Sequence, residues 1–137
     1  LGRARTSGHA VVFVPQDRIA YLSELFFCEE FPNMAQGWGV SWLRVLDAVQ
    51  SLEADIFVPG HGPLPADPRE TRASLRRMRQ LLVDTRDAIQ SEIARGANED
   101  QAVAAVKLQQ YEKIPNFAAQ RETTVRRMFK ELTGSLP

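Results

Sequence analysis

The sequence predicts an α/β (α+β) layered fold, in which helices cover a short mixed sheet and further helices form a C-terminal extension. Two runs rich in β-branched and aromatic residues come first, at Ala10–Val14 and Arg18–Leu22, and a third follows at Asp55–Val58. Helical spacing of apolar residues separates the second run from the third, and it dominates after Pro65. Strands that alternate with helices favour a sheet packed against a helical layer.

The first 66 residues predict the order β-β-loop-α-β. "AVVFV" and "RIAYL" predict a hairpin, because Pro15-Gln16-Asp17 between them is a turn-forming sequence. "SELFFCEEFPNMAQGWG" is apolar without a clean period, so we expect a loop that packs over other parts of the chain. "VSWLRVLDAVQSLEA" has apolar residues at helical spacing, which predicts a helix over Val40–Ala54 with Ser41 as its cap.

Residues 67–137 predict a helical portion of the same domain. Asp67 has the side chain of an N-cap, Pro68 suits the first helical position, and Gly96 is typical of the residue just past a helix end. At about 1.5 Å per residue, this helix would be longer than roughly 40 Å. A shorter helix is expected from Asn98, and a last one over Asn116–Leu132.

Length and charge indicate one globular domain with no nucleic-acid partner. The chain has 137 residues, a formal net charge of 0 and 44% hydrophobic residues. A nucleic-acid-binding protein would need a basic excess or stripe. The long helix does carry several arginines, but acidic residues share it, so we interpret a solvated face of mixed charge. These arginines are Arg69, Arg72, Arg76, Arg77 and Arg79.

The cysteine count and the hydropathy pattern bear on location. Cys28 is the single cysteine, so no internal disulfide can form, and a reducing, cytoplasmic location is expected. No apolar run approaches the roughly 20 residues that a membrane span needs, so we expect no membrane partner.

One histidine stands on a rigid segment. In "DIFVPGHGPLP", a short strand ends at Pro59-Gly60-His61-Gly62-Pro63. His61 therefore lies just beyond the carboxyl end of a strand, where α/β proteins tend to place their sites. The flanking glycines allow close approach of another group, and the prolines fix the backbone. From spacing alone, His61 is either a ligand or a hydrogen-bonded loop residue.

The surrounding pattern resembles the C-terminal half of the metallo-β-lactamase superfamily. "VPGHGP" after a short strand and an amphipathic helix is the most specific segment, with the motif at 59–63. "GRARTSGHAVVFV" is similar to the family's G-x-x-H-T-x-G-H/D segment, and "RIAYLSELFF" to its R-V-L-F-x-G-D-x-F segment. "VRRMFKELTG" is also of a type seen in this family. The resemblance spans nearly the whole chain, in the right order.

The resemblance implies half of an αββα sandwich whose complete form usually holds two zinc or iron ions. Those metals make a hydroxide nucleophile from bound water. The family's H-x-H-x-D-H run is absent from this sequence. Arg5 stands at the second-half histidine and Glu24 at the bridging aspartate, so only His61 is the expected ligand. His9 is an acceptable ligand type at a position that does not normally ligate.

These departures predict a scaffold that has lost most of its metal ligands. We expect no cofactor, and zinc or iron only if His9, Glu24 and His61, or another chain, complete a site. Without a metal, Glu24 would need a partner, because a buried carboxylate is costly unless it is paired. We therefore expect Arg5 to act as the metal-replacing cation and to pair with Glu24. The alternative is that Arg5 is an ordinary surface residue at the start of a strand.

Half a sandwich predicts an uncovered sheet face. We expect that face to carry Val12, Val14, Leu22 and Phe57, and an apolar patch of this kind usually marks an interface. A second copy in a homodimer is the favoured cover. A separate chain that supplies the N-terminal half, or the C-terminal helices folding back, are the alternatives.

Three functions are compatible with these patterns. The first is a truncated metallo-β-lactamase-like protein that resembles a metal-dependent hydrolase but is not catalytic on its own. The second is a working hydrolase of an ester, thioester or lactam, whose site is completed by another chain or by the His9, Glu24 and His61 set. The third is a small-molecule binding module that uses the aromatic loop 26–42 as its pocket. Its lining would be Phe26, Phe27, Phe31, Trp38 and Trp42.

Overall fold

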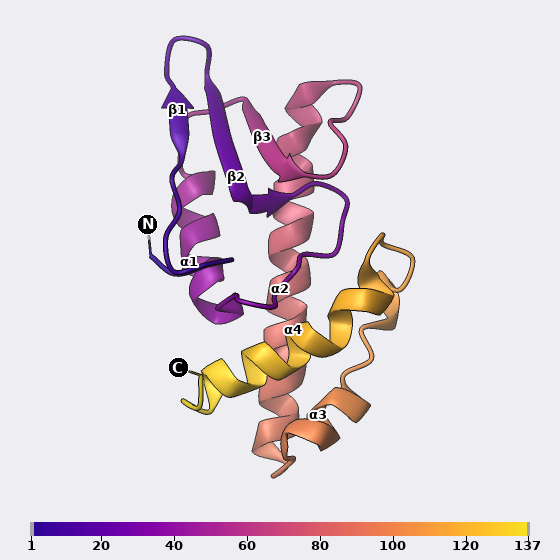
Figure 1. The fold of residues 1–137 in the computed structure, drawn as a ribbon. Helices are drawn as coiled ribbons and strands as arrows, with labels where there is room; N and C mark the ends of the chain where they lie inside the picture. The colour runs from indigo at the N-terminus through magenta and orange to yellow at the C-terminus, as the bar shows by residue number, and fades with distance from the viewer. Residues whose placement is uncertain (1, 137) are drawn as a thin grey trace.

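The computed structural model describes residues 2–136, and these form a three-stranded mixed sheet with four α-helices (Figure 1). This confirms the predicted α/β (α+β) fold class. The elements are β1 (Val12–Val14), β2 (Ile19–Phe27), α1 (Gly39–Gln50), β3 (Ile56–His61), α2 (Thr71–Ala94), α3 (Glu99–Ala105) and α4 (Phe117–Leu132). Short 3₁₀ turns precede α2 and α4, at Pro68–Glu70 and Gln109–Tyr111.

The sheet has the order β1-β2-β3, with β1 antiparallel and β3 parallel to β2. A parallel pair needs a crossover connection, and α1 provides it between β2 and β3. Figure 1 shows α1 and α2 behind the sheet, with α4 crossing α2 beyond the sheet's lower end and α3 beside it. α4 contacts α1, α2 and α3, so the last helix joins the two portions of the chain.

β2 and β3 are longer than the sequence indicated. The segment Ser23–Phe27 was expected to begin a loop, but it continues β2, and β3 runs on through His61. The extension depends on two glycines. A Cβ at Gly60 would overlap with the backbone of Ser23, and one at Gly62 would overlap with the Cys28 carbonyl. Without these side chains, the two strands remain close enough to continue pairing.

The added pairing is irregular. Tyr21 pairs with Val58, but Ser23 then pairs with Pro59 and Phe27 with His61, so β2 has more residues than β3 over the same span. Ser23 has φ 49°, in the left-handed region. Bulges of this kind bend a strand and re-aim its side chains. Here they place Glu24 on the stretch of β2 that runs beside His61.

The helix caps differ in part from expectation. Asp67 accepts a hydrogen bond from the Arg69 N–H, as predicted, but it caps the 3₁₀ turn that precedes α2. α2 itself has 24 residues, about 36 Å, and is shorter than predicted for that reason. Ser41 does not cap α1, which begins at Gly39.

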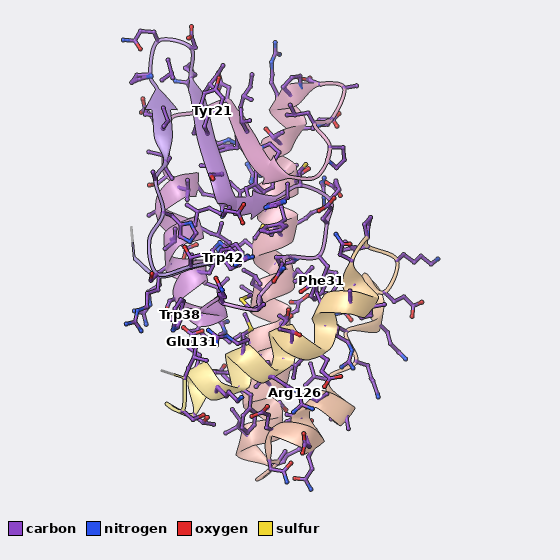
Figure 2. All side chains as sticks on the ribbon, in the orientation of Figure 1. Tyr21, Phe31, Trp38, Trp42, Arg126 and Glu131 are labelled. Atoms are coloured by element: carbon purple, nitrogen blue, oxygen red, sulfur yellow. The ribbon has the colours of Figure 1, made fainter. Side chains whose placement is uncertain are left out.

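The N-terminus of α1 is satisfied from α4. The backbone N–H groups of Val40 and Ser41 each donate to the Glu131 carboxylate at 2.9 Å, and the Ser41 hydroxyl donates to it at 2.7 Å. Figure 2 shows Glu131 close to Trp38 at the start of α1. A carboxylate at this end also faces the positive end of the helix dipole. One side chain of α4 thus replaces the missing cap.

Four of the five expected pocket aromatics, Phe26, Phe27, Phe31 and Trp42, belong to the core. Phe26, Phe31 and Trp42 are buried to within 1% of full burial, and the Trp42 indole N–H donates to the Leu25 carbonyl at 3.1 Å. Phe26 lies in β2, Trp42 in α1, and Phe31 in the loop between them, where it contacts Phe117 of α4. Burial of such large side chains stabilises the fold. Phe26 and Trp42 thus contribute to the core, and a pocket lined by these two side chains stays a prediction.

One sheet face is uncovered, but only part of the expected set lies on it. Leu22 and Phe57 are fully buried, because they point toward the helices. Val12, Tyr21 and Val58 are direct cross-strand partners on the other face, where Val12 is 58% and Tyr21 46% exposed. Figure 2 shows Tyr21 on the sheet, away from the helical layer. We call Val12, Tyr21 and Val58 the open face.

A substitution at Gly62 tests the close approach of β3 to β2. Gly62 and Gly96 have nearly the same positive φ, 85° and 83°, but only Gly62 has another part of the chain against it. Gly96→Ala should cost about 1–2 kcal/mol for the left-handed backbone alone. Gly62→Ala should add about 1–3 kcal/mol of overpacking to that cost. Urea unfolding of both variants measures the difference, and equal losses would show that the close approach is not needed.

Candidate functional site

Glu24 is the centre of a charged cluster at the carboxyl end of β3. Its Oε1 accepts a hydrogen bond from His61 Nε2–H at 2.8 Å, and its Oε2 lies 3.9 Å from Arg5 Nε. Glu24 comes from β2, His61 from β3 and Arg5 from the segment before β1. The side chains of Glu24 and His61 are 42% and 40% exposed, and that of Arg5 is 16% exposed.

Three contacts fix the position of His61. Its ring stacks on Phe27 with 4.3 Å between ring centroids and 11° between planes. Its carbonyl accepts from the Cys28 N–H at 2.9 Å, directly beside the close approach at Gly62. Its Nε2 is oriented by Glu24. The sequence singled out His61 between two glycines, and the structure shows close backbone contact at both glycines. A role of His61 as a ligand stays a prediction.

Arg5 has donors left over. At 3.9 Å its Nε is too far from Glu24 for a hydrogen bond, although the two charges attract. This nitrogen is buried and has no hydrogen-bond partner among residues 2–136. The expected pairing of Arg5 with Glu24 is thus present as a long ion pair. Its part as a substitute for a metal stays a prediction.

His9 does not join the cluster as a ligand. Its Nε2 accepts a hydrogen bond from the Thr6 N–H at 2.9 Å, so that lone pair is in use. Within the described part of the chain, no three His, Cys, Asp or Glu side chains gather closely enough to hold a metal ion. The His9, Glu24 and His61 set is therefore not assembled, and these residues do not fit the zinc or iron site that the resemblance implies.

A polar cavity of about 210 Å³ adjoins the cluster. Arg5 and His61 line it beside Phe27 and Phe31, so two of the five aromatic residues expected in a pocket are there. Its remaining lining residues are Glu30, Asn33, Asn116 and Gln120. No pattern in the sequence pointed to Asn116 and Gln120, because only the crossing of α4 brings them to this place.

A second, more apolar cavity of about 280 Å³ lies beside it. Met78, Leu81 and Ile114 supply apolar surface, and Phe27 and Glu30 line both cavities. The second cavity was missed because its walls come from β2, α2 and the turn before α4, which no local pattern relates.

The surroundings of Trp38 and Cys28 indicate roles in packing. Arg3 and Arg127 lie over the Trp38 ring, at 5.0 and 5.5 Å from its centroid, so Trp38 contacts cations and lines neither cavity. Burial raises the pKa of the Cys28 thiol, which makes it a poor nucleophile near neutral pH.

The chain matches no protein-family model and no curated protein. Among residues 2–136, no helix is both long and apolar enough to cross a membrane.

The surroundings of His9 predict a loss of stability in mild acid. Burial lowers the pKa of His9 below its ordinary value of 6.5. The unfolded chain then binds the proton more readily, so the free energy of unfolding should fall as the pH drops below about 6.5. Protonation of Nε2 would also break its bond from the Thr6 N–H.

Unfolding in urea between pH 7 and 5 measures this slope. His9→Gln keeps an acceptor but cannot titrate, so the slope should become shallower in that variant. Glu29 and Asp55, whose pKa values Arg77 and Arg18 lower, affect stability only at more acidic pH. An unchanged slope in His9→Gln would assign the effect to another group.

Proposed function

We propose that this chain is a metallo-β-lactamase-like layer whose metal site has become a metal-independent binding site for a small molecule, without hydrolytic activity of its own. The observation that carries the proposal is the contact of Glu24 with both His61 Nε2–H and Arg5. The adjoining cavities supply the room for a ligand. The single free thiol, Cys28, favours a cytoplasmic location.

The chemistry of the donor set supports the loss of the metal. A histidine nitrogen that donates a hydrogen bond has no free lone pair for a cation. A guanidinium carries a permanent positive charge and also has no lone pair to give. A metal bound by Glu24 Oε1 and His61 Nε2 would therefore have to break the hydrogen bond between them. It would also approach the positive charge of Arg5. The proposed function therefore includes no metal-dependent catalytic step.

The open face favours a second chain packed against it, and this leads to a second candidate function. Val12, Tyr21 and Val58 are uncharged, and the nearby Arg18 and Asp55 neutralise each other through two hydrogen bonds at 2.8 and 3.0 Å. An apolar surface without net charge is complementary to a copy of itself, so we propose a homodimer through this face. A chain carrying the family's first half would instead complete a hydrolase of an ester, thioester or lactam.

Metal content tests the loss of the metal site. After expression in medium supplemented with zinc and iron, we expect far less than one ion per chain by elemental analysis. Arg5→His with Glu24→Asp restores the ligand types of the family, and this double variant should retain more zinc than the wild type. Arg69→His, just before α2, is the matched control for adding a histidine. A stoichiometric metal in the wild type would overturn the proposal.

The mass in solution tests the homodimer. We expect light scattering to give twice the 15.4 kDa of one chain. Tyr21→Lys places a charge on the open face and should shift the mass to the monomer. Leu64→Lys is the control, because Leu64 is 55% exposed but lies outside the sheet. A monomeric wild type, or equal effects of the two substitutions, would contradict this interface.

A further inference from the structure

The two cavities are adjacent, because Phe27 and Glu30 line both. The polar cavity has a guanidinium and an imidazole in its lining, from Arg5 and His61. The larger cavity is the more apolar of the two. This combination suits a small molecule that has a charged end and an apolar end.

The charged end meets a cation with unused donors. Arg5 Nε is buried and lacks a hydrogen-bond partner within residues 2–136, and the ion pair with Glu24 is too long to be a hydrogen bond. Asn33 and Gln120 add side-chain amides to the same lining. Nε itself is shielded, so a carboxylate of a ligand would accept hydrogen bonds from the terminal nitrogens of the Arg5 guanidinium and from these amides.

Glu30 is a carboxylate without a cation. Glu24 has Arg5 and His61, and Glu29 has Arg77 and the Ser74 hydroxyl. For Glu30, no lysine, arginine or histidine within residues 2–136 lies within ion-pair distance. Within the same described residues, its one side-chain hydrogen bond is a long one, of 3.4 Å from Asn116. Glu30 therefore has the capacity to bind a cationic group of a ligand.

The larger cavity offers an apolar surface to that ligand. Met78, Leu81 and Ile114 line it together with the ring of Tyr111. The Tyr111 hydroxyl donates to Asp84, so the polar end of this side chain is already satisfied. Burial of an apolar group here is favoured by the hydrophobic effect.

We propose that the two adjacent cavities together bind, across Glu30, a small zwitterion with a large apolar side chain, the chemistry of an apolar α-amino acid. The carboxylate binds Arg5, the ammonium binds Glu30, and the side chain enters the cavity between Met78, Leu81 and Ile114. The inference rests on the proposed function, because it requires Arg5 and His61 to be free of metal.

Calorimetric titration of the full chain tests this assignment with four probes. L-phenylalanine and L-leucine carry both charges, 3-phenylpropanoate lacks the ammonium, and 2-phenylethylamine lacks the carboxylate. We expect at least one of the amino acids to bind, and both single-charge analogues to bind at least tenfold more weakly than L-phenylalanine. A charge-assisted contact of ordinary strength accounts for a factor of this size.

Glu30→Gln separates the ammonium contact from the rest. It should weaken binding of the amino acid at least tenfold and leave 3-phenylpropanoate binding unchanged or stronger. Glu53→Gln, an exposed change outside both cavities, should alter neither. Circular dichroism checks that each variant is folded.

Two results would overturn the inference: no binding of either amino acid, or equal affinity for L-phenylalanine and 3-phenylpropanoate. Metal analysis of the same sample tells the two proposals apart. A metal-free protein that binds no probe contradicts only the ligand assignment. A stoichiometric metal contradicts the proposed function as well.

Discussion

The close approach of β3 to β2 at Gly60 and Gly62 is the constraint on which the site depends. Any larger side chain at either position would meet the backbone of Ser23 or Cys28. Because both positions are glycine, the strands stay paired as far as Phe27 and His61. The irregular register then brings Glu24 and His61 to 2.8 Å, and it places Phe27 as the shared wall of both cavities. A motif that resembles part of a metal site therefore has a backbone role that needs no metal.

The rest of the site is assembled from distant parts of the chain. Arg5 belongs to the segment before β1, and Asn116 and Gln120 lie at the start of α4. Trp38 holds these parts near each other: its backbone N–H donates to the Ala4 carbonyl at 2.8 Å, and Arg127 of α4 lies over its ring. The polar cavity is thus a product of tertiary packing, and its position depends on α4 as much as on the sheet.

Sequence patterns predicted the features that depend on neighbouring residues, such as helices and their caps. Periodic apolar residues located α1, α2 and α4. The helix expected from Asn98 is α3, where Asn98 forms a capping box. His61 was singled out by its place between two glycines after a strand, and Glu24 only through a resemblance that no comparison supports; the structure brings the two together. The errors arose where distant residues decide. Trp42 belongs to the core because Leu25 accepts its N–H, and β2 is long because β3 can approach it. The sequence did not single out Glu30, because only the structure shows that no cationic side chain within residues 2–136 pairs with it.

The cap of α1 by Glu131 has a consequence for folding during synthesis. The two partners Ser41 and Glu131 are ninety residues apart. At about 5–20 residues per second, the ribosome adds Glu131 roughly 5–20 s after Ser41. During this interval the N–H groups of Val40 and Ser41 lack the carboxylate that accepts their hydrogen bonds in the folded chain. The cap of α1 can therefore form only after nearly the whole chain has been synthesised, although α1 itself is made early.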